Sequence, residues 1–200
     1  MEITINNYFE KRNTLFKLRF ETSNINKLAM TFLMACITGL MAQIVIPLPW
    51  TPVPITAQTF AVLTAGILLG RYWGGLSMVL YLLIGIAGVP WFTGMTGGIT
   101  AVTGATGGFL IGFIITALFM GYTGNYNNTK SFKSILGLLL VSNFAFIYIP
   151  GLIGLGVWLY IVNGTIPDIG TLLIMGLLPF IAGDLIKISG AAILAKAVNP

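Results

Sequence analysis

Apolar residues fill most of this chain in long stretches, and polar residues gather at its beginning and in the connections between the stretches. About 20 apolar residues in helical conformation cross the hydrocarbon core of a bilayer. The pattern therefore predicts an all-α integral membrane protein that turns back at each polar connection. Six transmembrane helices are expected, at residues 28–47, 56–70, 72–89, 107–123, 134–162 and 170–197.

Two of these stretches contain residues that predict bends. Pro150 removes a backbone donor inside the fifth stretch, and Gly151, Gly154 and Gly156 follow it, so a kink is expected there. Pro179 either kinks the sixth stretch in the same way or marks the residue where its membrane part begins.

Composition supports a membrane protein and excludes several kinds of chemistry. Hydrophobic residues make up 56% of the chain, charged residues make up 8%, and the mean hydropathy is +0.95. A soluble domain carries about 25% charged residues, so this chain cannot cover itself with a solvated surface. The sequence contains no histidine, the commonest metal ligand and proton shuttle. We therefore expect neither a metal nor a cofactor.

The residue inventory also argues against an enzyme. No G-x-x-x-x-G-K-[ST] loop is present, so any ATP that drives this protein must be hydrolysed by another subunit. Without histidine there is no Ser-His-Asp arrangement, and Ser189 lies only two residues from Lys187, on a different helix face. Asp184 is the only carboxylate in a clear span, whereas an intramembrane aspartyl protease needs two.

The distribution of basic residues predicts the orientation of the chain in the membrane. The connections after spans one, three and five contain no Lys or Arg, so the positive-inside rule places both termini in the cytoplasm. We interpret residues 1–27 as a cytoplasmic basic segment at the plasma membrane, with no role in nucleic-acid binding, and residues 28–200 as the membrane domain. The basic residues outside the spans are Lys11, Arg12, Lys17, Arg19, Lys27, Arg71, Lys130 and Lys133, and Lys196 lies at the end of span six.

The connections without basic residues have unusual compositions. The segment 47–54 contains four prolines and is expected to be rigid and extended. In the next connection, Thr93, Thr96, Thr100 and Thr103 would form one polar helical stripe. Their hydroxyls either satisfy backbone carbonyls or, with the N–H groups of the intervening glycines and of the helix starting near residue 107, bind an anion such as a carboxylate. In the last connection, Asp168 is expected to cap the following helix.

Asp184 and Lys187 stand in the apolar run LLPFIAGDLIKISG. Three residues apart on a helix, their side chains are neighbours. Each charge costs roughly 2.5–3.5 kcal/mol to insert at the centre of a membrane helix. The pair is either a structural ion pair or part of a substrate site, which intramembrane ionisable residues commonly mark.

Small residues recur on the first predicted span. Thr31, Ala35 and Gly39 lie four residues apart, and such stripes allow helices to approach closely in lipid. Packing within the bundle and docking of a partner subunit are both consistent with this stripe.

Three segments together resemble the BioY family, the biotin-binding S components of energy-coupling factor (ECF) transporters. They are PWTPVPITAQTFAVLTAGILLG (49–70), GVPWFTGMTGGITAVTGATGGFLIGF (88–113) and PFIAGDLIK (179–187). The resemblance implies a six-helix S-component fold that captures biotin from outside. Our mechanistic hypothesis is that the 48–58 and 93–106 loops then close over biotin before it is delivered inward. The resemblance also implies coupling to a transmembrane T component and two ATP-binding subunits, with docking through the small residues Thr31, Ala35 and Gly39.

Two departures from the family pattern concern the glycine loop. The family usually has G-P-[ST]-G-G-Y, where this chain has GATGGF with Ala105 and Phe109. Some members also have an asparagine and an arginine roughly where this chain has Thr96 and Leu110. Part of the carboxylate recognition must therefore differ in this chain.

The resemblance and the chemistry of biotin together give an expected binding site. Asp184 can accept a hydrogen bond from a ureido N–H and Lys187 can donate to the ureido carbonyl, although Lys187 could instead take the carboxylate. Apart from this pair, the residues expected to contact the substrate are Gln58, Trp91, Phe92, Thr93, Thr96, Thr106 and Phe109.

Three rival functions remain at this stage. They are an S component for another vitamin, a stand-alone secondary transporter of a small acid, and an intramembrane enzyme, which the residue inventory disfavours. The sequence leaves open whether the chain works alone, as a homo-oligomer, or with dedicated or shared ATPases.

Overall fold

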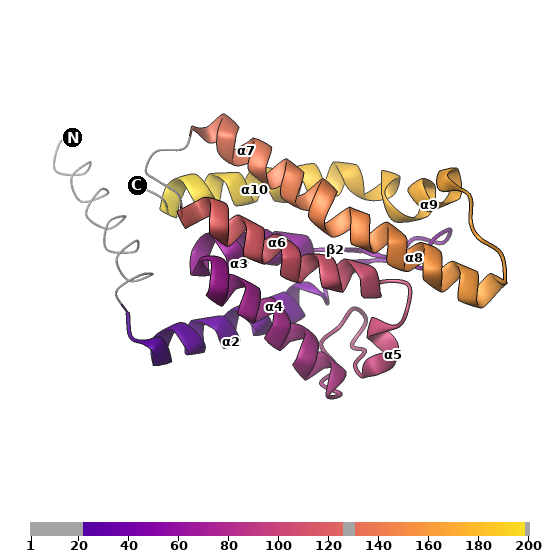
Figure 1. Ribbon diagram of the computed structural model, residues 1–200, viewed down its shortest axis with the longest axis horizontal. Coiled ribbons are helices and arrows are strands. Elements are labelled where there is room, and N and C mark those ends of the chain that lie inside the picture. The colour runs from indigo at the N-terminus through magenta and orange to yellow at the C-terminus, as the bar shows by residue number, and fades with distance from the viewer. Residues whose placement is uncertain (1–21, 126–130, 199–200) are drawn as a thin grey trace.

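The computed structural model describes residues 22–125 and 131–198. Most of the predicted basic segment 1–27, and Lys130, lie outside the described residues. Long helices run side by side along the longest axis of the molecule, and the start of α2 and the end of α10 lie at the same end of it (Figure 1). The elements in chain order are α2 (Asn24–Met41), β1 (Val45–Ile46), β2 (Ile55–Thr56), α3 (Gln58–Leu69), α4 (Arg71–Ile86), α5 (Ile99–Val102), α6 (Gly107–Asn125), α7 (Phe132–Val141), η1 (Ser142–Ile147), α8 (Tyr148–Asn163), α9 (Ile169–Gly176), η2 (Leu178–Phe180) and α10 (Ile181–Val198).

Helices occupy each of the predicted apolar stretches. Three helical segments are long and apolar enough to cross a membrane by length and composition: Asn24–Met41, Phe132–Asn163 and Ile169–Val198. The helices Gln58–Leu69, Arg71–Ile86 and Gly107–Thr123 are apolar but shorter. The chain is therefore a membrane protein with several apolar helices, and its fold is mostly helical.

The first helix departs from its predicted bounds at both ends. It begins earlier, at Asn24, where the Ser23 hydroxyl accepts a hydrogen bond from the Asn26 N–H, and it ends at Met41 rather than at residue 47. The chain then forms the short antiparallel pair β1–β2, in which Val45 faces Thr56 and Ile46 faces Ile55. The proline-rich segment 47–54 connects the two strands of this hairpin. The fold is therefore not the purely α-helical one predicted from the sequence.

The fifth predicted span is one helical rod that changes its winding in the middle. Residues Ser142–Ile147 form a π-helical turn between α7 and α8, and Pro150 lies in the first turn of α8. Proline is tolerated in a first helical turn, because the N–H it lacks would have no partner inside α8. The irregularity thus lies just before Pro150, not at the glycines that follow it.

The glycines of this rod serve close packing. A Cβ on Gly151 would lie 2.4 Å from the ring of Phe109, and one on Gly154 would lie 2.7 Å from the Cα of Gly108. A Cβ on Gly108 itself would lie 2.1 Å from the Pro150 carbonyl oxygen. Helices α6 and α8 therefore touch backbone to backbone, which places α6 deep in the bundle.

The sixth predicted span divides into two helices. Pro179 lies in the short 3-10 turn η2 between α9 and α10, so it marks the start of the long helix α10. The predicted cap at Asp168 is confirmed: its carboxylate accepts from the N–H of Thr171 at 3.0 Å and from the Thr171 hydroxyl at 2.6 Å. These bonds hold the pKa of Asp168 below its ordinary value.

The small-residue stripe of α2 faces the interior of the bundle. Thr31 and Ala35 are fully buried, and a Cβ on Gly39 would lie 3.0 Å from the side chain of Trp91. The Thr31 hydroxyl donates to the Lys27 carbonyl within the same helix. These positions fit packing inside the chain, and no exposed docking surface is formed by the three residues.

Candidate functional site

A cavity of about 300 Å³ lies inside the bundle, between α10 and the two connections rich in proline and glycine. Its wall combines a buried acid and base, several threonines and a set of aromatic rings. Such a mixture suits a small ligand with polar groups on an apolar frame. The lining residues are Pro52, Val53, Pro54, Thr56, Gln58, Thr59, Phe92, Thr93, Thr96, Ala101, Thr106, Phe109, Leu110, Phe113, Ile147, Tyr148, Phe180, Asp184 and Lys187.

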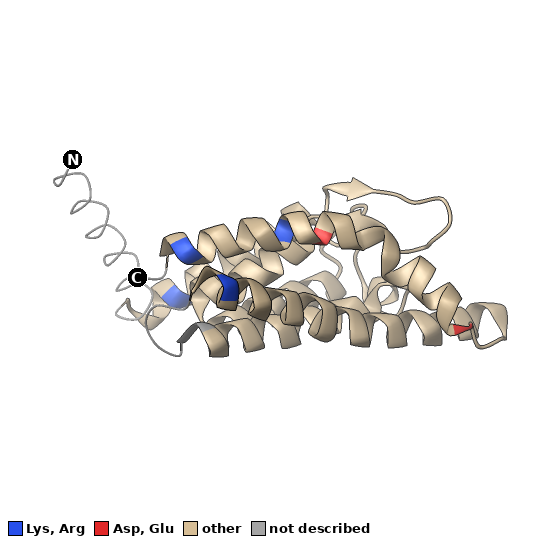
Figure 2. Cartoon of the chain, turned by 90° about the horizontal axis from the view of Figure 1, so that it is seen from above, with Lys and Arg blue, Asp and Glu red and all other residues tan. Residues whose placement is uncertain are grey.

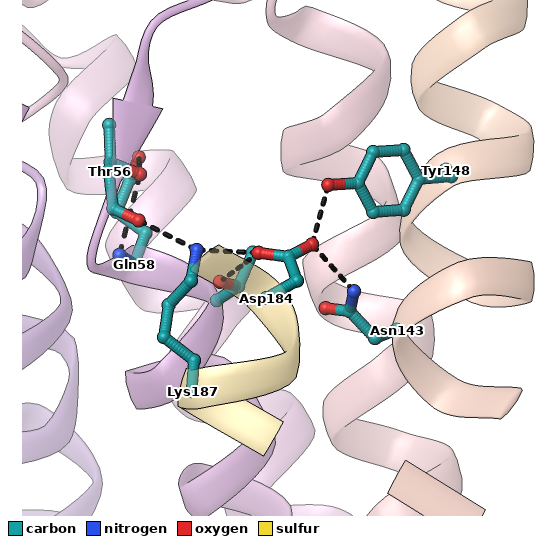
Figure 3. Close-up of polar contacts among 7 residues, drawn as sticks. Thr56, Gln58, Asn143, Tyr148, Asp184 and Lys187 are labelled. Carbon is teal, nitrogen blue, oxygen red and sulfur yellow. Dashed lines mark hydrogen bonds and ion pairs between the residues drawn. The ribbon is translucent and has the colours of Figure 1, made fainter. Parts of the chain in front are cut away.

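Asp184 is the most deeply buried charged group of the described chain, with 1% of its surface exposed. It lies in the first turn of α10, where the positive end of the helix dipole favours a negative charge. Its Oδ1 lies 2.6 Å from Lys187 Nζ. Its Oδ2 accepts hydrogen bonds from the Asn143 amide at 2.7 Å and from the Tyr148 hydroxyl at 2.5 Å (Figure 3). The charge is therefore compensated within the protein.

Lys187 stands one helical turn further along α10 and reaches across to the hairpin. Its ammonium contacts Asp184 and donates to the backbone carbonyl of Thr56 in β2 at 2.9 Å (Figure 3). An ammonium has three N–H donors, so one donor is left for a molecule in the cavity. The i, i+3 spacing read from the sequence thus gives an adjacent acid and base that both line the cavity.

Gln58, at the start of α3, is held on both sides of its amide. Its Nε2 donates to the Tyr81 hydroxyl at 2.8 Å, and its Oε1 accepts from the hydroxyls of Thr56 at 3.0 Å and Thr93 at 3.3 Å. Gln58 therefore ties β2, α4 and the glycine-rich connection together at the cavity wall. These contacts fix the threonine hydroxyls that face the same space.

The structure brings most of the predicted substrate residues together. Asp184, Lys187, Gln58, Phe92, Thr93, Thr96, Thr106 and Phe109 all line the cavity. Trp91 does not: its indole N–H donates to the Tyr81 carbonyl at 2.9 Å, and its ring packs beside Tyr81 and against Gly39 of α2. Trp91 therefore supports the wall from behind instead of facing the cavity.

The predicted helical stripe of threonines is wrong. Only Ile99–Val102 is helical in this region, and Gly94 and Gly98 have φ values of +71° and +87°, which interrupt any helix. Thr93 and Thr96 consequently line the cavity. Thr100 and Thr103 are exposed, and the Thr103 hydroxyl donates to the carbonyls of its own short helix.

The connection that carries these threonines is fastened by Gln43, which follows the end of α2 and donates to the Gly39 carbonyl of that helix. Its Nε2 donates to the carbonyls of Trp91 at 3.1 Å and Phe92 at 3.0 Å, and its Oε1 accepts from the N–H of Met95 at 3.0 Å. The proline-rich connection has its own attachment, because the Thr51 hydroxyl donates to the Met175 carbonyl of α9 at 2.7 Å. The glycine-rich segment is thus held by the residue that follows α2, and the proline-rich segment by α9.

Helix α6 begins at the cavity wall. Thr106 directly precedes it, and Phe109 and Leu110 in its first turn also line the cavity. Gly107 and Gly108 leave no space for a side chain, because a Cβ would lie 1.7 Å from the Val102 carbonyl oxygen or 2.1 Å from that of Pro150. The glycines of GATGGF therefore let the helix start against its neighbours.

Sequence reasoning missed several residues of the site. Thr59 of α3 donates weakly to Asp184 Oδ1 at 3.4 Å, and Asn143 and Tyr148 hold Oδ2. A signal was available for one of them: Asn143 is an amide inside the apolar run LLLVSNFAFIYIP, and polar groups inside a span face the bundle. The two aromatic residues Phe113 and Phe180 complete the apolar wall.

These features define a helical membrane protein with an internal cavity whose lining suits a small, partly polar ligand. The BioY family model matches residues 12–200, and the chain belongs to the BioY family.

Individual proteins of known name agree with this membership. The chain is 52% identical to the probable biotin transporter BioY of Methanothermobacter thermautotrophicus over 137 residues, which are 68% of this chain and 87% of that protein. It is 32% identical to the biotin transporter BioY of Thermotoga maritima over 154 residues, 75% of this chain and 83% of that protein. Its fold resembles the crystal structure of the S component for biotin from an ECF-type ABC transporter, with a TM-score of 0.76 and 27% identity over 88% of this chain and 93% of the other.

Proposed function

We propose that this protein is a biotin-capturing S component, a membrane subunit that binds the vitamin and passes it inward with the help of an energy-coupling module. The observation that carries the proposal is the buried pair of Asp184 and Lys187 in the wall of a ligand-sized cavity. The named relatives are biotin transporters, and the site has the acceptor and donor that a ureido ring requires. The protein is a transport subunit and not an enzyme.

The ureido ring of biotin is assigned to the Asp184–Lys187 end of the cavity. This ring is neutral and presents two N–H donors beside one carbonyl acceptor, which match a carboxylate and an ammonium side by side. Among the described residues that line the cavity, Lys187 is the only basic one, and its ammonium lies 2.6 Å from the Asp184 carboxylate. A biotin carboxylate bound to Lys187 would therefore lie close to the negative charge of Asp184. Repulsion between the two carboxylates therefore favours the ureido orientation.

The carboxylate tail is assigned to the threonine end of the cavity. Thr93, Thr96 and Thr106 line it there, and Thr106 directly precedes α6, whose N-terminal N–H groups favour an anion. Leu110 stands where some relatives are expected to have an arginine. The thioether ring and the tail methylenes would then lie along Phe92, Phe109 and the neighbouring aromatic rings.

The proposal includes six membrane crossings with both termini in the cytoplasm. Apart from one that stands beside an acidic residue, the basic residues of the described chain gather toward the end of the molecule where α2 begins and α10 ends, and an acidic residue marks the opposite end (Figures 1 and 2). The protein is proposed to lie in the plasma membrane. The positive-inside rule then places the basic end of the molecule on the cytoplasmic side. The cavity then lies under the two connections expected on the outer side, so biotin enters from outside.

Energy coupling is proposed to come from a transmembrane T component and two ATP-binding subunits. The chain carries no nucleotide-binding loop of its own. In this proposal the segments 48–58 and 93–106 close over biotin before delivery. Docking through Thr31, Ala35 and Gly39 would require α2 to turn these buried residues outward, so we do not assign the docking surface to them.

Titration of the purified protein with biotin tests the proposal. We expect saturable binding of one biotin per chain, competition by biotin amide, which keeps the ureido ring, and no competition by a panel of other vitamins. Absence of biotin binding, or tighter binding of another vitamin, would refute the assignment. Copurification of a T component and ATPases tests the coupling separately, and ion-driven uptake in cells without those ATPases would favour a stand-alone transporter.

A further inference from the structure

The two oxygens of the Asp184 carboxylate have different surroundings. Oδ2 accepts from Asn143 at 2.7 Å and from Tyr148 at 2.5 Å, whereas Oδ1 contacts Lys187 (Figure 3). Oδ1 also accepts from the hydroxyl of Thr59 at 3.4 Å. A carboxylate oxygen has about two acceptor positions. Oδ2 is therefore saturated by the protein, and a donor in the cavity can reach only Oδ1, in place of the long Thr59 contact.

The π-helical turn explains how both donors reach the same oxygen. In an α-helix, residues five apart are separated by about 140° around the axis, because each residue advances by about 100°. A π-helix bonds residues five apart, so they lie on the same face of the helix. Asn143 and Tyr148 are five residues apart across Ser142–Ile147, and this turn directs both toward Asp184.

The Asn143 side chain donates to Asp184 through its amide nitrogen, while its amide oxygen is left without a hydrogen bond among the described residues. Asn143 is fully buried, and its Oδ1 has no hydrogen-bond partner among the described residues. The opposite amide orientation would point this oxygen at a carboxylate, so the donor contact fixes the orientation. Leaving a buried acceptor unsatisfied is unfavourable. The position of Asn143 thus serves its hydrogen bond to Asp184, although its own acceptor stays unsatisfied.

We propose that Asn143 and Tyr148 are positioning residues for ligand recognition, and that the π-helical turn exists to bring them to Asp184. They hold the carboxylate so that Oδ1 faces the ureido N–H of the ligand, which makes this inference depend on the proposed function. Asn143 lies behind the wall and acts only through Asp184. Tyr148 acts through its hydroxyl, while its ring packs between Phe109 and Phe144.

Two substitutions test the inference in a double-mutant cycle. Tyr148→Phe and Asn143→Leu should each weaken biotin binding about tenfold, the effect of losing one hydrogen bond to a charged group. In an Asp184→Asn protein, titrated at correspondingly higher biotin concentration, the same substitutions should change binding less than about twofold, since no ionised carboxylate remains to be oriented. Ser142→Ala is the matched control, because Ser142 is buried in the same turn and bonds Leu138 and Met120 instead of Asp184. We expect it to leave binding unchanged.

The possible outcomes separate this inference from the proposed function. A wild-type protein that does not bind biotin refutes the proposed function. A wild-type protein that binds biotin, with Tyr148→Phe and Asn143→Leu binding equally well, overturns only the inference. Equal losses with and without the Asp184 charge overturn it too, because they show a purely structural role. If Asn143→Leu does not fold, Tyr148→Phe decides the outcome, because it keeps the packed ring.

Discussion

Two regions of the cavity differ in what holds them in place. The floor is formed by Asp184, Lys187 and Tyr148, with Asn143 behind it. The roof is formed by the connections 47–54 and 91–106. Charged and polar side chains from several helices meet at the floor, at distances of 2.5–2.7 Å around one carboxylate. The roof is fastened by neutral hydrogen bonds to backbone groups, through Gln43 and Thr51.

This difference suggests separate roles for the floor and the roof in ligand selectivity and in the rate of ligand exchange. Charge-assisted hydrogen bonds are roughly twice as strong as neutral ones, and a buried charge cannot lose its partners cheaply. The floor is therefore expected to keep one geometry and to decide which molecule fits. The roof can open by breaking a few neutral bonds, so it is expected to decide how fast a ligand enters and leaves.

The largest effect is expected at the floor. Lys187→Met leaves the buried Asp184 carboxylate without its counter-charge, so the free energy of unfolding should fall by about 3–5 kcal/mol. Thermal unfolding in detergent measures this loss. Lys196→Met, on an exposed face of the same helix, is the matched control and should unfold like wild type. A Lys187→Met protein as stable as wild type would show that the floor is not held by charge.

The second effect concerns the helix pair that joins floor and roof. Gly108→Ala places a methyl group 2.1 Å from the Pro150 carbonyl oxygen, and this overpacking should lower stability by about 1–3 kcal/mol or more. Because α8 also carries Tyr148, biotin binding should weaken as well. Gly137→Ala is the control: a Cβ there meets nothing within 4 Å, and we expect unchanged or slightly higher stability. Equal melting temperatures for both variants would contradict the described α6–α8 contact.

At the roof we expect a kinetic effect. Gln43→Leu removes the bonds from the residue just after α2 to the connection 91–96, which should raise the biotin dissociation rate about tenfold while the melting temperature changes little. Stopped-flow or chase experiments measure this rate. Thr103→Val, an exposed change in the same connection, should leave the rate unchanged. A lower melting temperature without faster release would show that Gln43 supports the fold instead of the roof.

The smallest effect is expected outside both regions, at the Asp168 cap of α9, the helix whose Met175 carbonyl holds Thr51. The pKa of Asp168 is lowered from an ordinary value of 3.8 by its bonds to Thr171, so its stabilisation is complete above that value and is lost as pH falls through the folded-state pKa. Asp168→Ala should melt slightly below wild type at pH 7 and equally at pH values below the folded-state pKa. A difference that persists in acid would show that charge is not its cause.

The helices and the acid–base pair were predictable from sequence, and the reasons are physical. Long apolar runs require helices in a membrane, and side chains three residues apart on a helix are neighbours, which gave Asp184 beside Lys187. The hairpin β1–β2 was not predictable, because a pair of two-residue strands leaves no alternating pattern to recognise. The threonine stripe failed because spacing alone ignored the glycines that interrupt the helix.

The remaining part of the site depends on geometry that α-helical periodicity does not contain. Asn143 and Tyr148 lie on one face only because the winding changes at Ser142–Ile147. Trp91 was predicted in the site because it is aromatic. In the structure its indole N–H donates to the Tyr81 carbonyl, and its ring packs against Gly39 of α2. Thr59 stood beside a predicted residue and was overlooked, since only the approach of α10 gives it a partner.

Biotin titration of the double variant Asp184→Asn/Lys187→Met, compared with wild type, tests most directly whether this pair serves recognition. Removing both charges leaves no unpaired buried ion, so the double variant should melt closer to wild type than Lys187→Met does. If the pair recognises the ureido ring, its affinity for biotin should nonetheless fall at least about a hundredfold. A folded double variant that binds biotin as wild type does would mean that the pair only joins helix α10 to its neighbours.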